Sequence, residues 1–155
     1  MQLIRDEMVR MPVRFWIAFA LVLVSCAAET SPLQDMADEG LGISKGVHFS
    51  SPPELKVQLA QDLLTHASKY DHLISRSPDL AYTAKAQGFQ RQEREAAATL
   101  MREAAADYAK RQDMANARAL YQSIVTSFPE KEYGPIRRAA ESALTQLNDM
   151  EKEAK

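Results

Sequence analysis

Cys26 is the residue with the most distinctive chemistry in this sequence, because it is the single cysteine among 155 residues. It comes just after an unbroken run of ten apolar residues, 15–24, which Arg10 and Arg14 precede. At about 1.5 Å per residue, a helix of that length spans about 15 Å, half the hydrocarbon core of a bilayer. The run therefore suits the apolar region of a secretory signal and is too short for an ordinary membrane-spanning helix. A thiolate is a good nucleophile for alkylation, and Cys26 supplies the single thiol of the sequence.

The segment 23–26, with the sequence Leu-Val-Ser-Cys, resembles the lipobox of bacterial lipoprotein signal peptides. That pattern is a branched apolar residue, a small or branched residue, a small residue and an obligatory cysteine. The resemblance implies transfer of a diacylglyceryl group to Cys26, cleavage between Ser25 and Cys26, and acylation of the new amino group. Two or three acyl chains would anchor the protein permanently, since each buried CH₂ contributes about 0.8 kcal/mol. The alternative is an ordinary signal peptide with an incidental cysteine.

The residues on either side of this segment bear on the localisation of the protein and on its start codon. Ala27 and Ala28 resemble the default pattern for export to the outer membrane. We therefore expect residues 1–25 to be a lipoprotein signal peptide, and the protein to be anchored in the bacterial cell envelope, facing the periplasm from the outer membrane. Asp6 and Glu7 are unusual in the charged region of a signal. The start codon stays open among three positions: Met1, Met8 and Met11.

The other residues that could do chemistry form no catalytic or metal-binding pattern. His66 and Asp62 are four residues apart and share a helix face, whereas His66 and His72 are six apart, about 240° around a helix, and cannot hold one metal ion. We expect a solvated histidine beside a carboxylate. Glutamates and arginines alternate through 91–103, as is typical of an exposed helix with surface ion pairs. Motifs for phosphate cradles, nucleophile elbows and zinc hydrolases are missing, so the sequence predicts no enzyme, no cofactor and no metal.

Composition narrows the class of protein further. The formal net charge of −2, with 26% charged residues, gives no basic stripe for nucleic acid. A single cysteine excludes an internal disulfide framework and a cysteine-rich zinc site. Five glycines and seven prolines exclude collagen-like and Pro/Gly-rich disordered chains. The chain beyond the signal is long enough for one modest domain.

Residues 26–51 are predicted to form the lipidated cysteine and a flexible linker. This stretch holds three of the five glycines and no sustained apolar period. The alternative is that Leu41, Ile43, Val47 and Phe49 pack on the domain as an extended arm, with a spacing that permits a short edge strand.

Residues 52–150 are predicted to fold as an all-α domain of about four antiparallel helices, because apolar residues recur every three or four positions. No run of β-branched and aromatic residues is long enough for a sheet. Ser51 is expected to cap the first helix, with a proline at its first position. The second helix spans about 79–111, either unbroken or interrupted near Gly88, and its alanines favour continuity. Residues 151–155 are expected to fray.

Asp79 is expected to cap the second helix and Asp113 the third, and the fourth helix is expected to begin at Gly134-Pro135. Residues 98–131 resemble a tetratricopeptide repeat, an antiparallel helix pair of about 34 residues. Small and aromatic residues and a closing proline fall at sites expected for the family: Ala105, Tyr108, Ala117, Tyr121 and Pro129. The family's usual Trp, Leu and Ala are replaced at three positions: Met101, Ala104 and Ile124.

This resemblance implies a concave groove along the first helix of the repeat, lined by Thr99, Arg102, Ala106 and Lys110. Arg102 and Lys110 could then clamp an acidic or C-terminal carboxylate of a peptide. The alternatives are that both are ordinary solvated charges and that the domain is an unrelated four-helix bundle.

The signal and the helical domain together predict a lipid-anchored envelope lipoprotein that acts as a protein–protein adaptor or assembly factor. Its expected partners are another envelope protein or a peptide, together with the membrane through the lipid. The alternative is a structural helical envelope lipoprotein that self-associates and has no peptide-binding groove.

Overall fold

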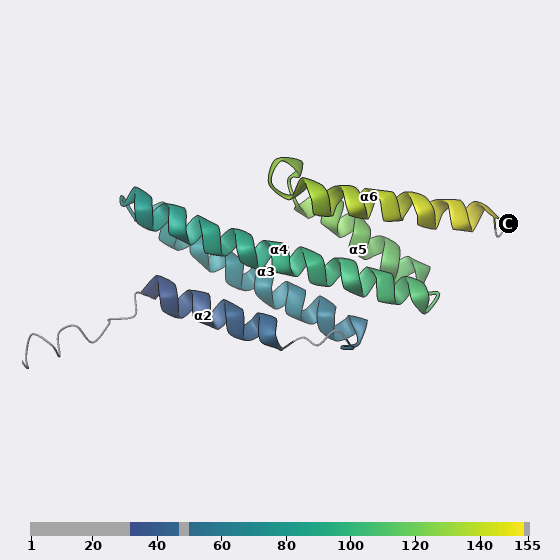
Figure 1. Cartoon of the computed structure of the whole chain (residues 1–155), viewed down its shortest axis with the longest axis horizontal. Coiled ribbons are helices and arrows are strands. Elements are labelled where there is room, and N and C mark those ends of the chain that lie inside the picture. Colours follow the sequence, from purple (N-terminus) through teal and green to yellow (C-terminus); the bar gives the residue numbers. More distant parts are fainter. Residues whose placement is uncertain (1–31, 47–49, 154–155) are drawn as a thin grey trace, which may run out of the picture. The chain divides into compact units, whose positions relative to one another are not determined.

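The computed structural model describes residues 32–46 and 50–153 of the chain. Within this part it contains no strand and five α-helices (Figure 1): α2 (Pro32–Lys45), α3 (Pro53–Arg76), α4 (Leu80–Lys110), α5 (Met114–Ser127) and α6 (Glu130–Glu153). The predicted all-α fold is confirmed. Ser25 and Cys26, with the rest of the predicted signal peptide, lie outside the described residues. None of the described helices is long and apolar enough to cross a membrane.

The chain divides into two compact units, residues 1–35 and 36–155. The first unit contributes only the first turn of α2 to the described residues, so the helix packing is that of the second unit. Consecutive helices from α3 to α6 pack against one another, and α4 and α6 lie in front of α3 and α5 in Figure 1. This arrangement makes α4 the central helix, because it contacts α3, α5 and α6.

Two helices begin with the capping chemistry that the sequence predicts. The Asp79 carboxylate accepts hydrogen bonds from the backbone N–H groups of Ala81 at 2.8 Å and Tyr82 at 3.3 Å. The Asp113 carboxylate accepts one from the backbone N–H of Asn116 at 3.2 Å. These bonds satisfy backbone donors that have no partner within the first turn of a helix.

The start of α3 differs from the prediction by one residue. Pro52 is the N-cap and Pro53 stands in the first turn, so the N-cap lies one residue after the predicted Ser51. A proline in the first turn has no N–H to satisfy and its ring presets the helical φ angle, so it favours a helix start here.

The long helix α4 runs unbroken through Gly88, which confirms the predicted continuity. In α6 the backbone departs from helical geometry at Tyr133, with φ −121° and ψ 23°. The regular helix resumes at Gly134-Pro135, in agreement with the predicted start of the fourth helix. Because Pro135 lacks an N–H and disfavours helical geometry in the residue before it, the chain kinks here.

Part of the predicted flexible linker is helical, since α2 occupies fourteen of its residues. Leu41 and Ile43, which were candidates for an extended arm, lie in this helix, and the other two candidates lie outside the described residues. The prediction failed because tertiary contacts override helix propensity, even where each glycine costs about 1 kcal/mol relative to alanine. Gly40 makes such a contact, against Glu93 of α4.

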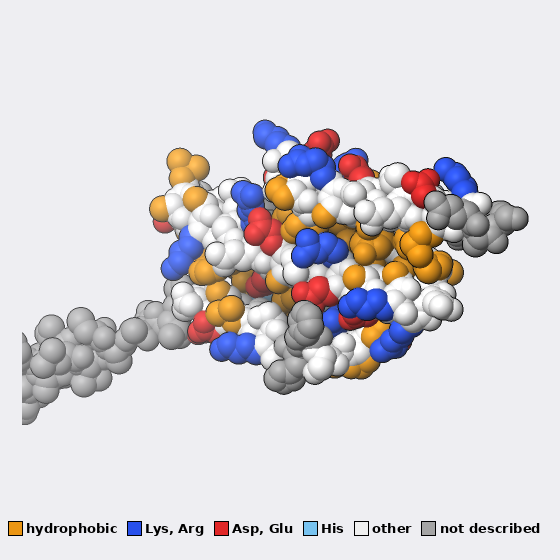
Figure 2. All heavy atoms as spheres, turned by 45° about the vertical axis from the view of Figure 1, so that its right-hand side comes forward, with side chains coloured by type: hydrophobic (Ala, Val, Ile, Leu, Met, Phe, Trp, Pro, Cys, Tyr) orange, Lys and Arg blue, Asp and Glu red, His pale blue; other side chains and the backbone are white. Residues whose placement is uncertain are grey.

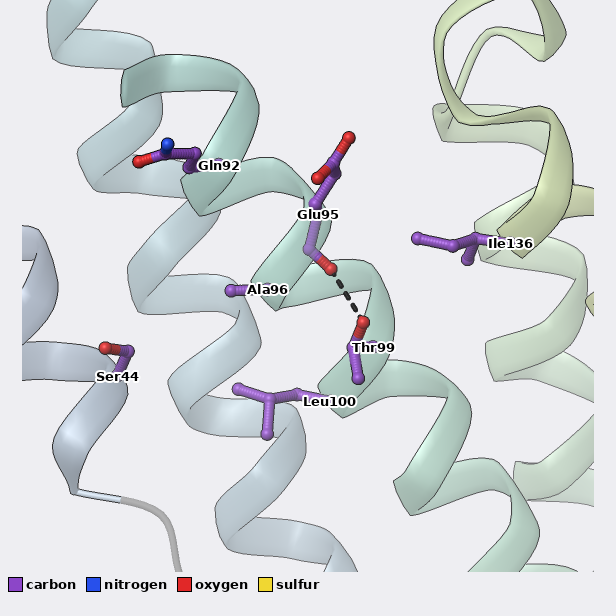
Figure 3. A pocket seen from close by; sticks show the side chains of 7 residues that line it. All are labelled: Ser44, Gln92, Glu95, Ala96, Thr99, Leu100 and Ile136. Atoms are coloured by element: carbon purple, nitrogen blue, oxygen red, sulfur yellow. Dashed lines mark hydrogen bonds between the residues drawn. The ribbon is translucent and has the colours of Figure 1, made fainter. Parts of the chain in front are cut away.

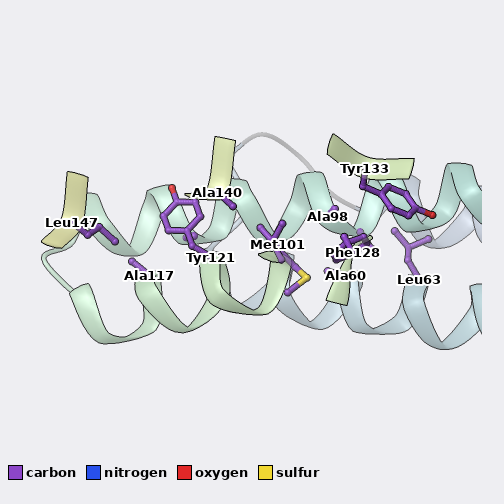
Figure 4. Close-up of a cluster of buried hydrophobic side chains, with 13 residues drawn as sticks. Ala60, Leu63, Ala98, Met101, Ala117, Tyr121, Phe128, Tyr133, Ala140 and Leu147 are labelled. Atoms are coloured by element: carbon purple, nitrogen blue, oxygen red, sulfur yellow. The ribbon is translucent and has the colours of Figure 1, made fainter. Parts of the chain in front are cut away.

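The hydrophobic core lies where α4 packs on its neighbours (Figure 4). The core face of α4 is built of four fully buried alanines: Ala97, Ala98, Ala104 and Ala105. A methyl side chain lets the helix axes approach closely, and larger residues fill the remaining space: Leu63, Met101, Tyr121, Ile124, Phe128, Tyr133 and Leu147. Phe128 and Tyr133 meet edge to face, with ring centroids 5.3 Å apart.

Candidate functional site

An open groove lies over the middle of α4, with α2 on one side and α6 on the other (Figure 3). Its volume is about 470 Å³. Ser44 lines it from α2 and Ile136 from α6, and α4 supplies the floor: Gln92, Glu95, Ala96, Thr99 and Leu100.

Two of the three polar side chains of this floor are partnered within α4. The Thr99 hydroxyl donates to the backbone carbonyl of Glu95 at 2.9 Å, and Arg91 Nε donates to the Glu95 carboxylate at 3.1 Å. The third, Gln92, is exposed, and the half-buried side chains of Leu100 and Ile136 add apolar surface. The groove therefore offers a ligand apolar contact area together with the exposed amide of Gln92.

The four residues that the sequence proposes for partner binding are not all at this groove. Thr99 lines it, whereas Arg102, Ala106 and Lys110 do not. Arg102 and Lys110 are exposed, and Lys110 Nζ donates to Asp107 of its own helix at 3.1 Å. The structure thus does not bring Arg102 and Lys110 together at the groove, and a clamp formed by them stays a prediction.

Behind the groove, a buried polar cluster joins α3 to α4. His66 Nδ1 lies 2.8 Å from Glu93 Oε2, and the Tyr70 hydroxyl donates to Glu93 Oε1 at 3.0 Å. His66 is 2% exposed and Glu93 8%. Burial and the Glu93 carboxylate raise the pKa of Tyr70 well above its ordinary value. The predicted solvated histidine beside Asp62 is wrong, and Glu93 does not belong to an exposed ion-pair surface, because the two residues are paired across the helix interface.

Helix α2 attaches to this cluster. Glu39 Oε1 lies 2.8 Å from Lys69 Nζ, and Glu39 Oε2 lies 3.4 Å from His66 Nε2. The hydrogen bond from Lys69 holds the pKa of Glu39 below its usual range. A Cβ at Gly40 would overlap the Glu93 carboxylate and come within 3.2 Å of His66 Nδ1. A glycine is therefore required for α2 to lie this close, and the cluster fixes one wall of the groove.

Two residues of this cluster carried a signal that sequence reasoning missed. Glu93 follows Ala86 by seven positions and precedes Ala97 by four, so helical spacing places it on the buried face of α4. His66 likewise lies between Leu63 and Tyr70 on the apolar stripe of its own helix. A charged or polar residue on such a stripe indicates a buried partner, because burying it alone is costly.

A second pairing, of Lys56 with Asp107, joins the N-terminal part of α3 to the C-terminal part of α4. Lys56 is 2% exposed, and its Nζ lies 2.7 Å from Asp107 Oδ2 and 3.6 Å from Glu103 Oε2. The hydrogen bond from Lys56 keeps the pKa of Asp107 below its ordinary value. Like the histidine cluster, this pairing holds the helix pair together, and its residues do not line the groove.

A hollow of about 310 Å³ adjoins His66, with Glu39, Asp62 and Lys69 among its lining residues. Glu39 already forms an ion pair with Lys69, which disfavours a metal ion at this carboxylate. In the part of the chain that the structure describes, no group of three or more His, Cys, Asp or Glu side chains could hold a metal ion.

No protein-family model, no curated protein and no solved structure matches this chain. Proposals about its function therefore depend on its residues and on their geometry.

Proposed function

We propose that this protein is a lipid-anchored lipoprotein of the bacterial cell envelope that acts as an adaptor, binding another envelope protein in the groove over α4. The observation that carries the proposal is the groove itself, walled by α2 and α6 and floored by α4. An apolar surface flanked by helices suits a short segment of a partner, which would bury its own apolar side chains there. In Figure 2, hydrophobic side chains gather in a hollow beneath the ridge that ends at the C-terminus, with Lys and Arg around it.

The length of chain between the lipobox and α2 limits where such a partner lies. Only five residues separate Cys26 from Pro32. Fully extended, that stretch spans at most about 20 Å. If Cys26 is lipidated, α2 therefore begins close to the membrane, and the partner is a protein whose recognised segment also lies near the membrane surface.

Pull-down of the full-length tagged protein from detergent-solubilised envelopes tests this proposal. Thr99→Glu puts a charge into the groove, and Leu80→Glu, at a side chain that is 85% exposed on the same helix, is the matched control. We expect one stoichiometric partner that is retained by Leu80→Glu and lost by Thr99→Glu, with both variants equally helical by circular dichroism. Loss of that partner from both variants alike would contradict binding in the groove.

The anchor is tested separately with Cys26→Ser. This variant should fail to incorporate labelled palmitate and should leave the membrane fraction. Equal partitioning of both forms would overturn the lipid anchor, and recovery of only a second copy of this chain would favour the self-associating alternative.

A further inference from the structure

A second cavity, of about 450 Å³, lies between α4 and the junction of α5 with α6. Five of its lining residues belong to α4. Gly88 is one, and the other four recur at i, i+3, i+4 and i+7, so they form one stripe on that helix: Gln87, Gln90, Arg91 and Arg94. Glu132 and Tyr133 line it from the kink at the start of α6. The cavity is thus distinct from the groove and is lined mostly by polar side chains.

Most of the donors in this cavity have partners within the protein. Arg91 Nε donates to Glu95 at 3.1 Å, and its Nη2 donates to the backbone carbonyl of Glu132 at 3.1 Å. Gln90 Nε2 donates to the Ala67 carbonyl at 3.0 Å and to Asp71 at 2.8 Å. These bonds hold both side chains in place on the wall of the cavity.

Arg94 differs from Arg91 and Gln90. It is half-buried, and it makes no hydrogen bond or ion pair with any residue that the structure describes. The hydroxyl of Tyr133 also lacks a hydrogen bond to any described residue. Burial raises the pKa of Tyr133 and the charge of Arg94, which lines the same cavity, opposes that rise. A partly desolvated cation without a counter-ion favours an anion beside it.

We propose that this cavity binds a carboxylate group, held by the guanidinium of Arg94, with the Tyr133 hydroxyl and unused N–H groups of Arg91 as further donors. The planar fork of a guanidinium matches a carboxylate with two parallel hydrogen bonds. Glu95 already pairs with Arg91, so Arg94 is the guanidinium of this cavity that makes no ion pair with a described residue, and a singly charged carboxylate matches it better than a doubly charged phosphate. Glu132 also lines the cavity; it is exposed and makes no ion pair among the described residues. Because its charge has the same sign as that of the carboxylate ligand, it weakens binding. This site does not depend on the proposed adaptor function.

The test is an NMR titration of the full-length, ¹⁵N-labelled protein in detergent micelles, which follows the arginine Nε–H signals. Sodium acetate is the probe, with sodium chloride at matched ionic strength as the control. We expect an arginine signal that is absent from Arg94→Gln to shift saturably with acetate and not with chloride. Arg94→Gln should weaken binding at least tenfold, as reported by the remaining Arg91 signal, whereas Arg111→Gln, at an exposed arginine just after the last residue of α4, should leave it unchanged. Glu132→Gln should tighten it several-fold.

Two further measurements extend this test. The first distinguishes the possible sources of the carboxylate, and the second uses a variant that is expected to fold normally. A short acetylated peptide that binds more tightly than acetate, and more tightly than its C-terminal amide, would identify a polypeptide as the source; equal binding of acetate and peptide would identify a small free acid. Gly88→Leu fills the cavity from a position where an added Cβ meets no atom within 4 Å, so this variant should fold normally and bind acetate weakly. Equal loss in Arg94→Gln and Arg111→Gln, unchanged binding in Gly88→Leu, or a preference for inorganic phosphate would each overturn the proposal.

Discussion

Two neighbouring stretches of α4 contact the other helices in different ways, one through apolar packing and the other through hydrogen bonds. Residues 97–105 pack through alanine methyl groups in the hydrophobic core. Residues 90–95, just before them, are entirely polar and contact other helices through hydrogen bonds to Asp71, Tyr70 and the backbone of Glu132. Alanine contacts set how closely the helices approach, whereas directional hydrogen bonds also set how they are aligned along their axes. The polar stretch is therefore the part of α4 that fixes the position of its neighbours.

The largest effect is expected in the core that surrounds the alanine stretch. Phe128 is 2% exposed and packs edge to face on Tyr133, so Phe128→Ala should lower the free energy of unfolding by about 3–5 kcal/mol. Leu80→Ala, at a leucine that is 85% exposed, should change it by less than about 0.5 kcal/mol. Urea unfolding followed by circular dichroism measures both. A loss in Phe128→Ala no larger than in Leu80→Ala would mean that the apolar region does not hold the fold.

The next effect is expected at the centre of the polar stretch. Glu93→Ala leaves His66 and the Tyr70 hydroxyl buried without their carboxylate, which should cost about 3 kcal/mol of unfolding free energy. Glu95→Ala, two residues later, breaks only a pair with Arg91 that is exposed on both sides, and should cost less than about 1 kcal/mol. The same urea titration compares the two. If the two variants are equally stable, the polar stretch is an ordinary solvated surface and the contrast with the alanine stretch disappears.

Substitutions at two glycines of α2 test how closely that helix approaches the buried cluster of His66, Tyr70 and Glu93. Gly40→Ala places a methyl group on the Glu93 carboxylate and should destabilise the protein by about 1–3 kcal/mol. Gly42→Ala meets no atom within 4 Å and should stabilise it by up to about 1 kcal/mol, because alanine is the better helix former. Thermal unfolding measures both variants. A lower melting temperature for Gly40→Ala and a higher one for Gly42→Ala would confirm the contact. Stabilisation by both substitutions would show that α2 does not lie against Glu93.

The smallest effect at neutral pH is expected from Tyr70→Phe, which removes one buried hydrogen bond and should cost about 1 kcal/mol. Tyr70 keeps its proton in the folded protein to a higher pH than the ordinary tyrosine pKa of 10.0, which applies to the unfolded chain. The stability linked to this raised pKa is present below pH 10.0 and is lost as the pH rises above it. The wild-type protein should therefore lose more stability than Tyr70→Phe between pH 8 and pH 11, about two units below and one above that value. Parallel alkaline curves for the two proteins would contradict the burial of this hydroxyl beside Glu93.

Local features of this chain could be predicted from the sequence, and contacts between helices could not. The caps at Asp79 and Asp113 and the unbroken course of α4 follow from chemistry within a few residues, so they were predicted. The pairing of His66 with Glu93 joins residues that are 27 positions apart, and no local rule specifies it. The same contact explains why α2 was missed, since its helix depends on packing at Gly40 rather than on the propensity of its own residues.

The candidate site shows the same division. The resemblance to a tetratricopeptide repeat implied a groove lined by four residues, of which only Thr99 lines the groove over α4. The walls of that groove come from α2, which the sequence did not predict, and from Ile136 in α6. The half-buried Arg94 lies in a stretch that looked uniformly exposed, and only the kink at Tyr133 turns that side of the helix into a cavity.

The contact of Gly40 with the histidine cluster has a consequence for how this sequence can evolve. Gly40, His66, Tyr70 and Glu93 depend on one another across three helices, so changing any one alone leaves either an overlap or a buried polar group without its partner. A lineage that left this arrangement one substitution at a time would have to pass through destabilised intermediates. Relatives of this protein should therefore carry all four residues or have exchanged them together, and correlated change between positions 40 and 93 would be its signature in an alignment.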